Sequence, residues 1–163
     1  MESIGAAARG WAAKAARTGL AAALFAAPFV ATPAAAAPER PRVVSINLCT
    51  DQLLLALADP EQILGLSPFV RDPRRSPVRD EAGRYPVLSG TAEEVLVLRP
   101  DLVLAGRFTR RATRELLKAH GLNVVEFEAA ASIAQVIGQI RRAGALLGHP
   151  ERAESKVAEI EAA

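Results

Sequence analysis

The sequence predicts an α/β fold in which a parallel sheet is flanked by helices, and three observations support this fold class. Short apolar runs typical of strands alternate with runs of helical spacing, and the links between them are short. Leu102–Ala105 has no polar interruption, as in a strand covered on both faces. The segment before it, Gly90–Pro100, is typical of a capped helix that a proline ends.

The first 36 residues predict a signal peptide that is removed from the mature chain. Gly19–Val30 is a short apolar stretch, and Ala34–Ala36 offers small residues for cleavage. The apolar stretch is shorter than the ~20 residues that span a bilayer, and no cysteine follows it closely for lipid attachment. A membrane anchor is the alternative. Three basic residues, Arg9, Lys14 and Arg17, precede the apolar stretch, as in a signal peptide. We therefore expect export to the periplasm and release of the mature chain.

Composition fits one globular domain without a nucleic-acid partner. Half of the residues are hydrophobic and 23% are charged, which is typical of a folded domain. The chain has 20 basic and 18 acidic residues; three of the former and one of the latter lie in the leader, which leaves seventeen of each. Because the mature chain has no excess of basic residues, its net charge does not favour binding to a nucleic acid or a membrane surface. Cys49 is the only cysteine, so no intrachain disulfide can form, and we expect it to be a small buried side chain.

The first mature segment predicts a strand, a helix, a second strand and a loop. Val43–Asn47 is the first strand, and Thr50 or Asp51 caps a helix that reaches Ala58. The buried face of this helix comprises Leu53, Leu54 and Leu57. The next two elements are a strand and a long polar loop rich in proline and arginine, at Ile63–Leu66 and Ser67–Arg84.

The next segment begins with a short apolar pair, Val87–Leu88, and continues into the capped helix. Thr91 and Glu94 have the spacing of a capping box, in which the glutamate folds back onto the first turn. The apolar face of this helix comprises Val95, Leu96 and Leu98.

The remaining chain predicts helix, strand, helix, helix. Thr109 caps a helix that stops at Gly121, and Asn123–Phe127 is the next strand. Ser132 caps a longer helix that Gly148 and Pro150 end. Its apolar residues recur at helical spacing at Ile133, Val136, Ile137, Ile140 and Leu147, and Glu151–Ala163 begins a further helical pattern.

No catalytic signature is present in the sequence. The turn after the first strand lacks the glycines of a dinucleotide site, and neither a phosphate-binding loop motif nor a nucleophile elbow occurs. The two histidines, His120 and His149, lie at expected helix ends, where the helix dipole favours them over a role as metal ligands. We expect no enzyme, no catalytic residue, no cofactor and no metal site.

A ligand crevice is expected beyond the carboxyl ends of the strands, where open parallel sheets bind ligands. The loops expected at that edge are Asn47–Thr50, Ser67–Arg84, Leu88–Thr91 and Gly106–Arg110. Aromatic rings and guanidinium groups there suit a large, flat or anionic chelate. The aromatic and arginine residues on or beside these loops are Phe69, Tyr85, Phe108, Arg71, Arg74, Arg75, Arg79, Arg107, Arg110 and Arg111.

The run LRPDLVLA, together with RVVSINLCTD upstream, resembles the amino-terminal lobe of periplasmic binding proteins that deliver cobalamin and ferric siderophores to ABC importers. The resemblance extends from about Pro41 to the carboxyl end. It implies a Rossmann-like lobe, the first of two, at residues 37–150 and the start of a truncated interlobe helix at 151–163, with the second lobe absent. A complete protein of its own kind is the alternative.

The resemblance also implies site residues. Phe69 falls where relatives have a ligand-contacting aromatic residue, and the loops at Asn47–Leu48 and Gly106–Arg107 fall on ligand-contacting loops. A glutamate seven residues before the proline docks the permease in relatives, which corresponds to Glu93. The full expected ligand-binding set is Asn47, Leu48, Phe69, Arg71, Tyr85, Ser89, Gly106, Arg107 and Phe108.

The function that follows is a monomeric solute-binding component that carries a metal chelate to an inner-membrane ABC permease. Cobalamin binders of this kind line the cleft with tryptophans, whereas the only tryptophan here is Trp11 in the leader and Gly106 replaces one of them. The arginines favour an anionic ferric siderophore or related iron complex, with cobalamin as the other candidate. Two different functions remain open: an enzyme on the same scaffold, and a single-lobe interaction or sensor protein that docks a membrane receptor without cargo.

Overall fold

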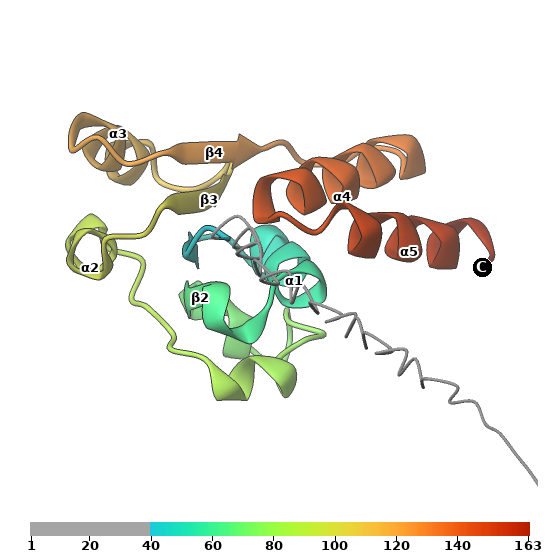
Figure 1. The fold of residues 1–163 in the computed structure, drawn as a ribbon. Coiled ribbons are helices and arrows are strands. Elements are labelled where there is room, and N and C mark those ends of the chain that lie inside the picture. The colour runs from blue at the N-terminus through green and yellow to red at the C-terminus, as the bar shows by residue number, and fades with distance from the viewer. Residues whose placement is uncertain (1–39) are drawn as a thin grey trace, which may run out of the picture. The chain divides into compact units, whose positions relative to one another are not determined.

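The computed structural model describes residues 40–163, which form a four-stranded parallel sheet with helices on both faces (Figure 1). The strand order is β2-β1-β3-β4, so the predicted fold class is confirmed. The predicted signal peptide lies outside the described residues. The strands are β1 (Val43–Ser45), β2 (Ile63–Gly65), β3 (Leu102–Gly106) and β4 (Val124–Phe127). The helices are α1 (Leu48–Leu57), α2 (Ala92–Leu98), α3 (Arg111–Ala119), α4 (Ile133–Leu147) and α5 (Pro150–Glu161).

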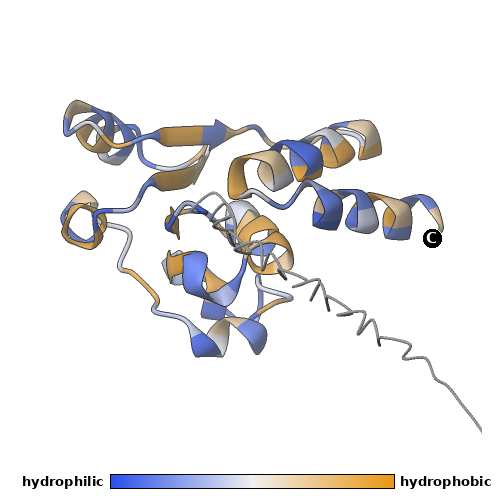
Figure 2. Cartoon of the chain, viewed as in Figure 1, coloured by the Kyte–Doolittle hydropathy of each residue, from blue (hydrophilic) through white to orange (hydrophobic). Residues whose placement is uncertain are grey.

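The sheet separates two apolar layers because successive strand residues point to opposite faces. On one face Val43 and Leu104 pack with residues of α1, α4 and α5. On the other face Val44 and Val103 pack with residues of α2 and α3. Figure 1 shows the same division of helices, and Figure 2 shows β3 and β4 as hydrophobic over most of their length. The continuous apolar run of β3 is therefore a strand covered on both sides, as predicted.

The strand order makes the adjacent pair β1 and β3 the place where the chain changes direction across the sheet. From β1 the chain passes through α1 to β2 on one side, and then through α2 to β3 on the other. Loops leaving the carboxyl ends of β1 and β3 therefore diverge to opposite faces. A crevice at such a point is where open α/β sheets hold ligands.

None of the predicted caps of α1, α2 and α3 forms the side-chain bond that was expected. Asn47 caps α1 by accepting from the Cys49 N–H at 3.0 Å, so this helix begins earlier than predicted. Thr91 precedes α2 but its side chain makes no capping bond. Thr109 accepts from the Gly106 N–H at 3.2 Å and stabilises the turn after β3 rather than the start of α3.

Glu94 does fold back, as predicted, but its target differs. Its Oε2 accepts from both the N–H and the hydroxyl of Ser89, at 2.6 and 2.7 Å. The carboxylate thereby closes the loop two residues before Thr91 instead of forming a reciprocal box with it. Val95, Leu96 and Leu98 lie on the packed side of α2, which confirms the predicted apolar face.

The proline- and arginine-rich loop contains two short 3-10 helices, η2 (Pro68–Arg71) and η3 (Glu81–Arg84), which the sequence did not indicate. Each buries one small apolar side chain completely, Val70 and Ala82 respectively. After this loop, Val87 forms a parallel bridge with Leu66 beside β2. The loop is therefore fixed to the edge of the sheet at both of its ends.

The carboxyl-terminal helices pack against each other as a pair (Figure 1). Ser132 caps α4 and Gly148 ends it in the left-handed conformation, both as predicted. Ile133 was expected on the apolar face but is exposed. A Cβ at Gly144 would lie 2.5 Å from that of Ala153, so the close approach of the two helices requires a glycine there.

Two single-residue predictions are also wrong. Cys49 is exposed, although its neighbours Thr50 and Asp51 in the first turn of α1 are completely buried. His149 lies at a helix end, as predicted, but it precedes the amino terminus of α5 and is completely buried, so the expected stabilisation by the helix dipole is wrong. Among residues 40–163 no helix is long and apolar enough to cross a bilayer.

A candidate ligand-binding hollow at the carboxyl edge of the sheet

A hollow of about 530 Å³ lies beyond the carboxyl ends of β1 and β3, at the point where the chain changes direction. Its walls come from the end of β1, the start of η2, the turn before α2 and the β3–α3 turn with one face of α3. These segments are far apart in sequence, and the parallel sheet brings them together. The lining residues are Ile46, Pro68, Phe69, Ser89, Gly90, Thr91, Ala92, Glu93, Phe108, Thr109, Arg110, Ala112, Thr113 and Leu116.

Large apolar side chains are exposed around this hollow. Phe69 is 46% exposed, Phe108 81% and Leu116 40%, and all three line it. They are three of the five large apolar side chains that are exposed in residues 40–163. Such a gathering on one concave surface is typical of a binding site.

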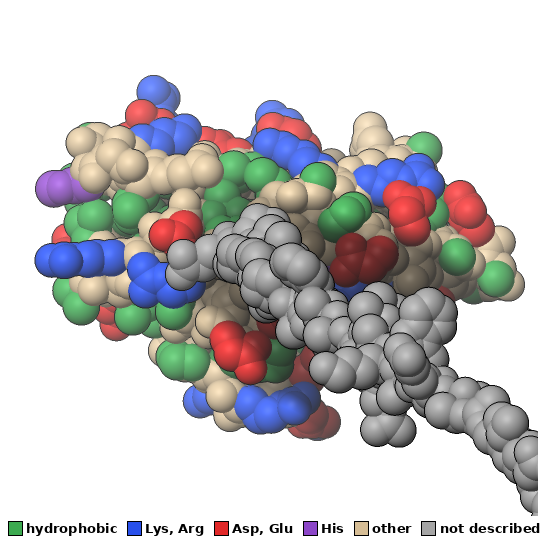
Figure 3. Space-filling model, in the orientation of Figure 1, with side chains coloured by type: hydrophobic (Ala, Val, Ile, Leu, Met, Phe, Trp, Pro, Cys, Tyr) green, Lys and Arg blue, Asp and Glu red, His purple; other side chains and the backbone are tan. Residues whose placement is uncertain are grey.

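Cationic groups border the same surface. The Arg75 guanidinium lies 5.8 Å from the centre of the Phe69 ring, a cation–π geometry, and Arg110 lines the hollow. Glu93 supplies the one carboxylate of the lining. Elsewhere the visible face of the molecule has basic and acidic side chains interspersed (Figure 3).

The structure brings three members of the predicted ligand-binding set together on the hollow: Phe69, Ser89 and Phe108. Asn47 and Gly106 lie beside it and touch each other, since a Cβ at Gly106 would come within 2.5 Å of the Asn47 side chain. The glycine therefore makes room for the cap of α1. Leu48 is half-buried and packs on the core beneath α1.

The other three members lie away from the hollow. Arg71 donates to the Tyr85 carbonyl oxygen at 3.2 Å, and Tyr85 packs on the core and borders a separate depression with Pro60 and Ile63. Arg107 borders another depression and lies 3.3 Å from the Glu128 carboxylate.

Sequence reasoning missed the face of α3 that completes the hollow. Ala112, Thr113 and Leu116 line it from this helix. Their spacing of three and four residues places them on one helical stripe, which is the signal that could have identified them. The signal was weak because α3 is otherwise polar and its one fully buried residue is Leu117.

A buried carboxylate contacts the residue that precedes one wall of the hollow. Asp51 is completely buried on α1 and accepts from the Ser67 N–H at 3.0 Å, and its second oxygen accepts from the Ser67 hydroxyl. Burial raises the pKa of Asp51 to about 6, against the opposing effect of hydrogen bonds from Ser45 and Ser67. Ser67 immediately precedes η2 and hence the wall residue Phe69.

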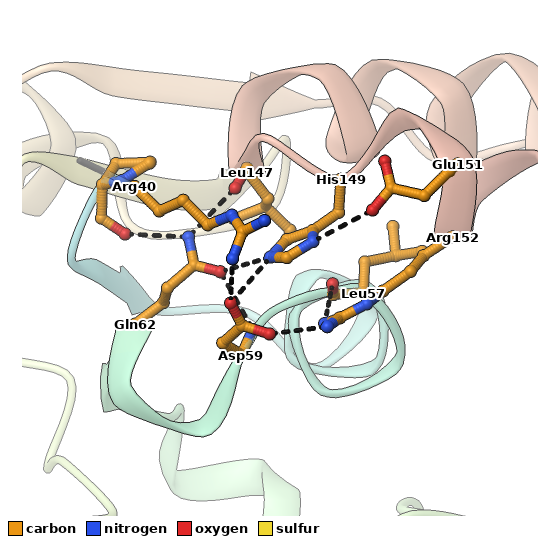
Figure 4. A network of polar contacts seen from close by, with 9 residues as sticks. Arg40, Leu57, Asp59, Gln62, Leu147, His149, Glu151 and Arg152 are labelled. Carbon is orange, nitrogen blue, oxygen red and sulfur yellow. Dashed lines mark hydrogen bonds and ion pairs between the residues drawn. The ribbon is translucent and has the colours of Figure 1, made fainter. Parts of the chain in front are cut away.

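A second polar network lies at the other end of the strands and centres on His149 (Figure 4). The His149 Nε2 is 2.8 Å from the Gln62 side-chain oxygen and 3.3 Å from Asp59. Gln62 in turn donates to the Leu147 carbonyl oxygen at 3.0 Å. Arg152 donates to Asp59 at 2.6 Å, and this bond holds the pKa of Asp59 below its usual range. The network joins the turn before β2 to the junction of α4 and α5.

The hollow has no side chain that prefers a transition metal. Its lining contains no histidine, cysteine, tyrosine or methionine, and no group of three or more potential metal ligands occurs among residues 40–163. The arrangement can hold an apolar surface against Phe69 and Phe108 while cations border it. It offers neither a nucleophile–base pair nor an ion cage within this lining.

Comparison with known proteins gives one family match. A model of the family described as "Periplasmic binding protein" matches residues 43–163. A curated relative, the cobalamin-binding protein of Halobacterium salinarum, is 33% identical over 128 residues, which make up 75% of this chain and 33% of that protein.

Solved structures share the fold over similar lengths. A periplasmic heme-binding protein from Pseudomonas aeruginosa superposes with a TM-score of 0.62 at 21% identity, covering 74% of this chain and 43% of the other. A possible iron-binding, periplasmic solute-binding protein from Staphylococcus epidermidis superposes with a TM-score of 0.63 at 22% identity, covering 76% and 48%. The chain thus spans about a third of the curated relative and less than half of these structures.

Proposed function

The chain belongs to the periplasmic binding protein family, and from that premise we propose that it forms a ligand-binding lobe of an exported receptor that presents a metal chelate to an ABC permease. The observation that carries this proposal is the hollow at the β1–β3 edge, with exposed Phe69 and Phe108 on its walls. Binding without catalysis agrees with relatives that are named as binding proteins.

We propose an anionic iron chelate with a broad organic surface as the ligand, either a heme-type macrocycle or a ferric siderophore. Aromatic rings favour a flat apolar surface, while Arg75 and Arg110 favour carboxylate or phenolate groups at its margin. Structures that share the fold include proteins named for heme and for iron. Cobalamin is the second candidate, because a 33% identical relative is named for it.

Comparison of four probes tests the ligand. The lining contains no histidine, cysteine, tyrosine or methionine, so this lobe should contact the organic framework and leave the metal to other groups. Heme and metal-free protoporphyrin should then bind the chain with affinities within a few-fold of each other, measured by absorbance titration. A ferric catecholate and cobalamin are the other two probes. Tighter binding of cobalamin than of either porphyrin would contradict the preference for an anionic iron chelate.

We propose that Glu93 is the contact with the permease. It is exposed in the first turn of α2, and no hydrogen bond or ion pair within residues 40–163 engages its carboxylate. A free carboxylate can pair with an arginine of a partner across an interface. We further propose that the protein acts as a monomer.

Export is the remaining part of the proposal. The predicted leader of 36 residues implies a mature chain that begins near Ala37 in the periplasm. Mass spectrometry of a periplasmic extract should find that amino terminus. Recovery of the chain from membranes with Met1 intact would show that the segment is an anchor instead.

A further inference from the structure

Four polar side chains are completely buried between β1, α1 and the end of β2: Ser45, Thr50, Asp51 and Ser67. Polar groups are excluded from water only at a cost, and an ionisable carboxyl is the most expensive of them. Each hydroxyl of the cluster has a partner, including a contact of 2.8 Å between Ser45 and Thr50. The cluster is therefore a built arrangement, and its one acid has no direct part in the hollow.

The carboxylate of Asp51 engages both donors of a single residue. One oxygen accepts from the Ser67 N–H at 3.0 Å, and the other accepts from the Ser67 hydroxyl. These two bonds fix the backbone and the side chain of Ser67 relative to α1. Hydrogen bonds to an ionised acceptor are about twice as strong as those between neutral groups.

Ser67 determines where the wall of the hollow begins. It precedes η2, in which Pro68 and Phe69 line the hollow and Val70 is anchored in the core. The Val70 N–H donates back to the Ser67 carbonyl oxygen at 3.2 Å. A shift of Ser67 would thus be transmitted to the Phe69 ring, which is 46% exposed and has the Arg75 guanidinium 5.8 Å from its centre.

We propose that Asp51 is a positioning residue for ligand binding, which acts through Ser67 to hold Phe69 against the hollow. The proposal rests on the proposed function in one respect, namely that the ligand occupies this hollow. It assigns a role to a buried acid that contacts no ligand itself. It also makes the shape of the hollow depend on the protonation state of that acid.

The environment of Asp51 sets the pH range of this dependence. Besides burial, the groups that act on it are the hydroxyl of Ser45 on β1 and the hydroxyl and N–H of Ser67 after β2, and no charged group contributes. Burial raises its pKa to about 6, so the carboxylate becomes protonated on mild acidification. The bonds to Ser67 then weaken, and affinity for the ligand should fall as the pH drops through about 6.

The test compares the chain with Asp51→Asn and Ser67→Ala, and Asp80→Asn serves as control because Asp80 is exposed and remote from the cluster. The probe is heme, titrated between pH 5 and 8, on the order of one unit to either side of the expected midpoint. The unmodified chain and the control should lose affinity several-fold on acidification. Asp51→Asn should bind several-fold more weakly at neutral pH and show no pH dependence, and Ser67→Ala should weaken binding in the same direction.

A second measurement needs no ligand and so separates this inference from the proposed function. The ring proton resonances of Phe69 should titrate with a midpoint near pH 6 in the unmodified chain and stay constant in Asp51→Asn. If heme fails to bind but these resonances titrate, the proposed function fails and the positioning role survives. Resonances that ignore both the pH and the substitution would overturn the role of Asp51, whatever the ligand.

Discussion

Two adjacent glutamates in the first turn of α2 have different surroundings. Glu94 accepts two hydrogen bonds from Ser89, at 2.6 and 2.7 Å. Glu93 lines the hollow, and no described residue pairs with its carboxylate. The sequence predicted a structural role for the first and an available carboxylate for the second. It did so because residue spacing along a helix start determines which side chain can fold back.

The pair predicts opposite phenotypes. Glu94→Ala should lower the free energy of unfolding by ~0.5–1 kcal/mol, because the loop at Ser89 loses its acceptor, and should leave permease association intact. Glu93→Ala should leave stability nearly unchanged and weaken association with the cognate permease. Denaturant melts and pull-down assays of both variants measure this. A Glu93→Ala protein that docks normally would remove the proposed contact.

Asp51 predicts an unusual pH dependence of stability. Its pKa is raised from 3.8 to about 6 in the folded protein, so between these values the folded state binds more protons than the unfolded state. Stability contributed by this group is therefore full below about pH 4 and is lost as the pH rises through about 6. Asp51→Asn should be more stable than the unmodified chain at neutral pH, by roughly 2–3 kcal/mol at most, and should lose the advantage near pH 4. Melts that find Asp51→Asn less stable at pH 7.5 would contradict this sign.

Most errors of the sequence analysis occur at this residue scale. Asn47, Thr91 and Thr109 all have side chains that can cap a helix, and which of them does so depends on tertiary contacts. Likewise, the position of His149 after a glycine indicated a helix end, but its burial depends on Gln62, which is remote in sequence. Local pattern identifies the candidates, and packing decides among them.

At the scale of elements, the polar network around His149 holds the start of α5. Arg152 of α5 donates both to Asp59 and to the Leu57 carbonyl oxygen, at 2.6 and 3.0 Å. His149 itself bonds to Gln62 before β2. Helix α5 is therefore attached to the lobe through its first turn as well as through its apolar contacts with α4.

Removing the centre of this network should loosen α5. His149→Ala should lower the free energy of unfolding by ~2–3 kcal/mol, because it opens a cavity and leaves the Gln62 side-chain oxygen with the Asp59 N–H as its remaining partner. Hydrogen exchange should accelerate in α5 more than in β3. The matched control is His120→Ala at the exposed end of α3, which should change stability little. Equal effects of the two substitutions would show that the network contributes nothing specific.

Elements themselves were largely predictable from the sequence. The four strands and five helices follow from apolar periodicity, from Gly148 as a helix stop and from Pro100 as a helix break. The exceptions are the three short 3-10 helices η1 (Pro60–Gln62), η2 and η3, whose helical turns are too short to show a period. The conformation of η2 and of η3 depends on Val70 and Ala82 reaching the core, and no local pattern in the sequence indicates this burial.

At the scale of the whole molecule, the position of the hollow follows from topology. The sheet order 2-1-3-4 separates the loops after β1 and β3, and the lining residues come from these loops and their neighbours. Sequence reasoning therefore placed the expected site at the edge where the hollow lies. It could not exclude Arg71 and Tyr85 from the hollow, because their direction is set by the path of the long loop around η2 and η3.

Affinity should be weak and sensitive to salt when this chain binds alone. One lobe covers one face of a ligand, so we expect a Kd on the order of 0.1–1 mM. If Arg75 and Arg110 face an anionic ligand, raising the ionic strength from about 0.05 to about 0.5 M should weaken binding several-fold. Calorimetry with heme at both salt concentrations measures this. Micromolar binding that is independent of salt would contradict both expectations.

The most direct test of the account is the affinity for heme after the exposed rings of the hollow are removed. Phe69→Ser and Phe108→Ser should each weaken binding about tenfold, because each removes a face on which the ligand packs. Val97→Ser is the matched control, since Val97 is as exposed as Phe108, at 81%, but lies outside the hollow; it should bind heme as the unmodified chain does. If both phenylalanine variants bind heme with unchanged affinity, the hollow beyond the carboxyl ends of β1 and β3 is not the ligand site.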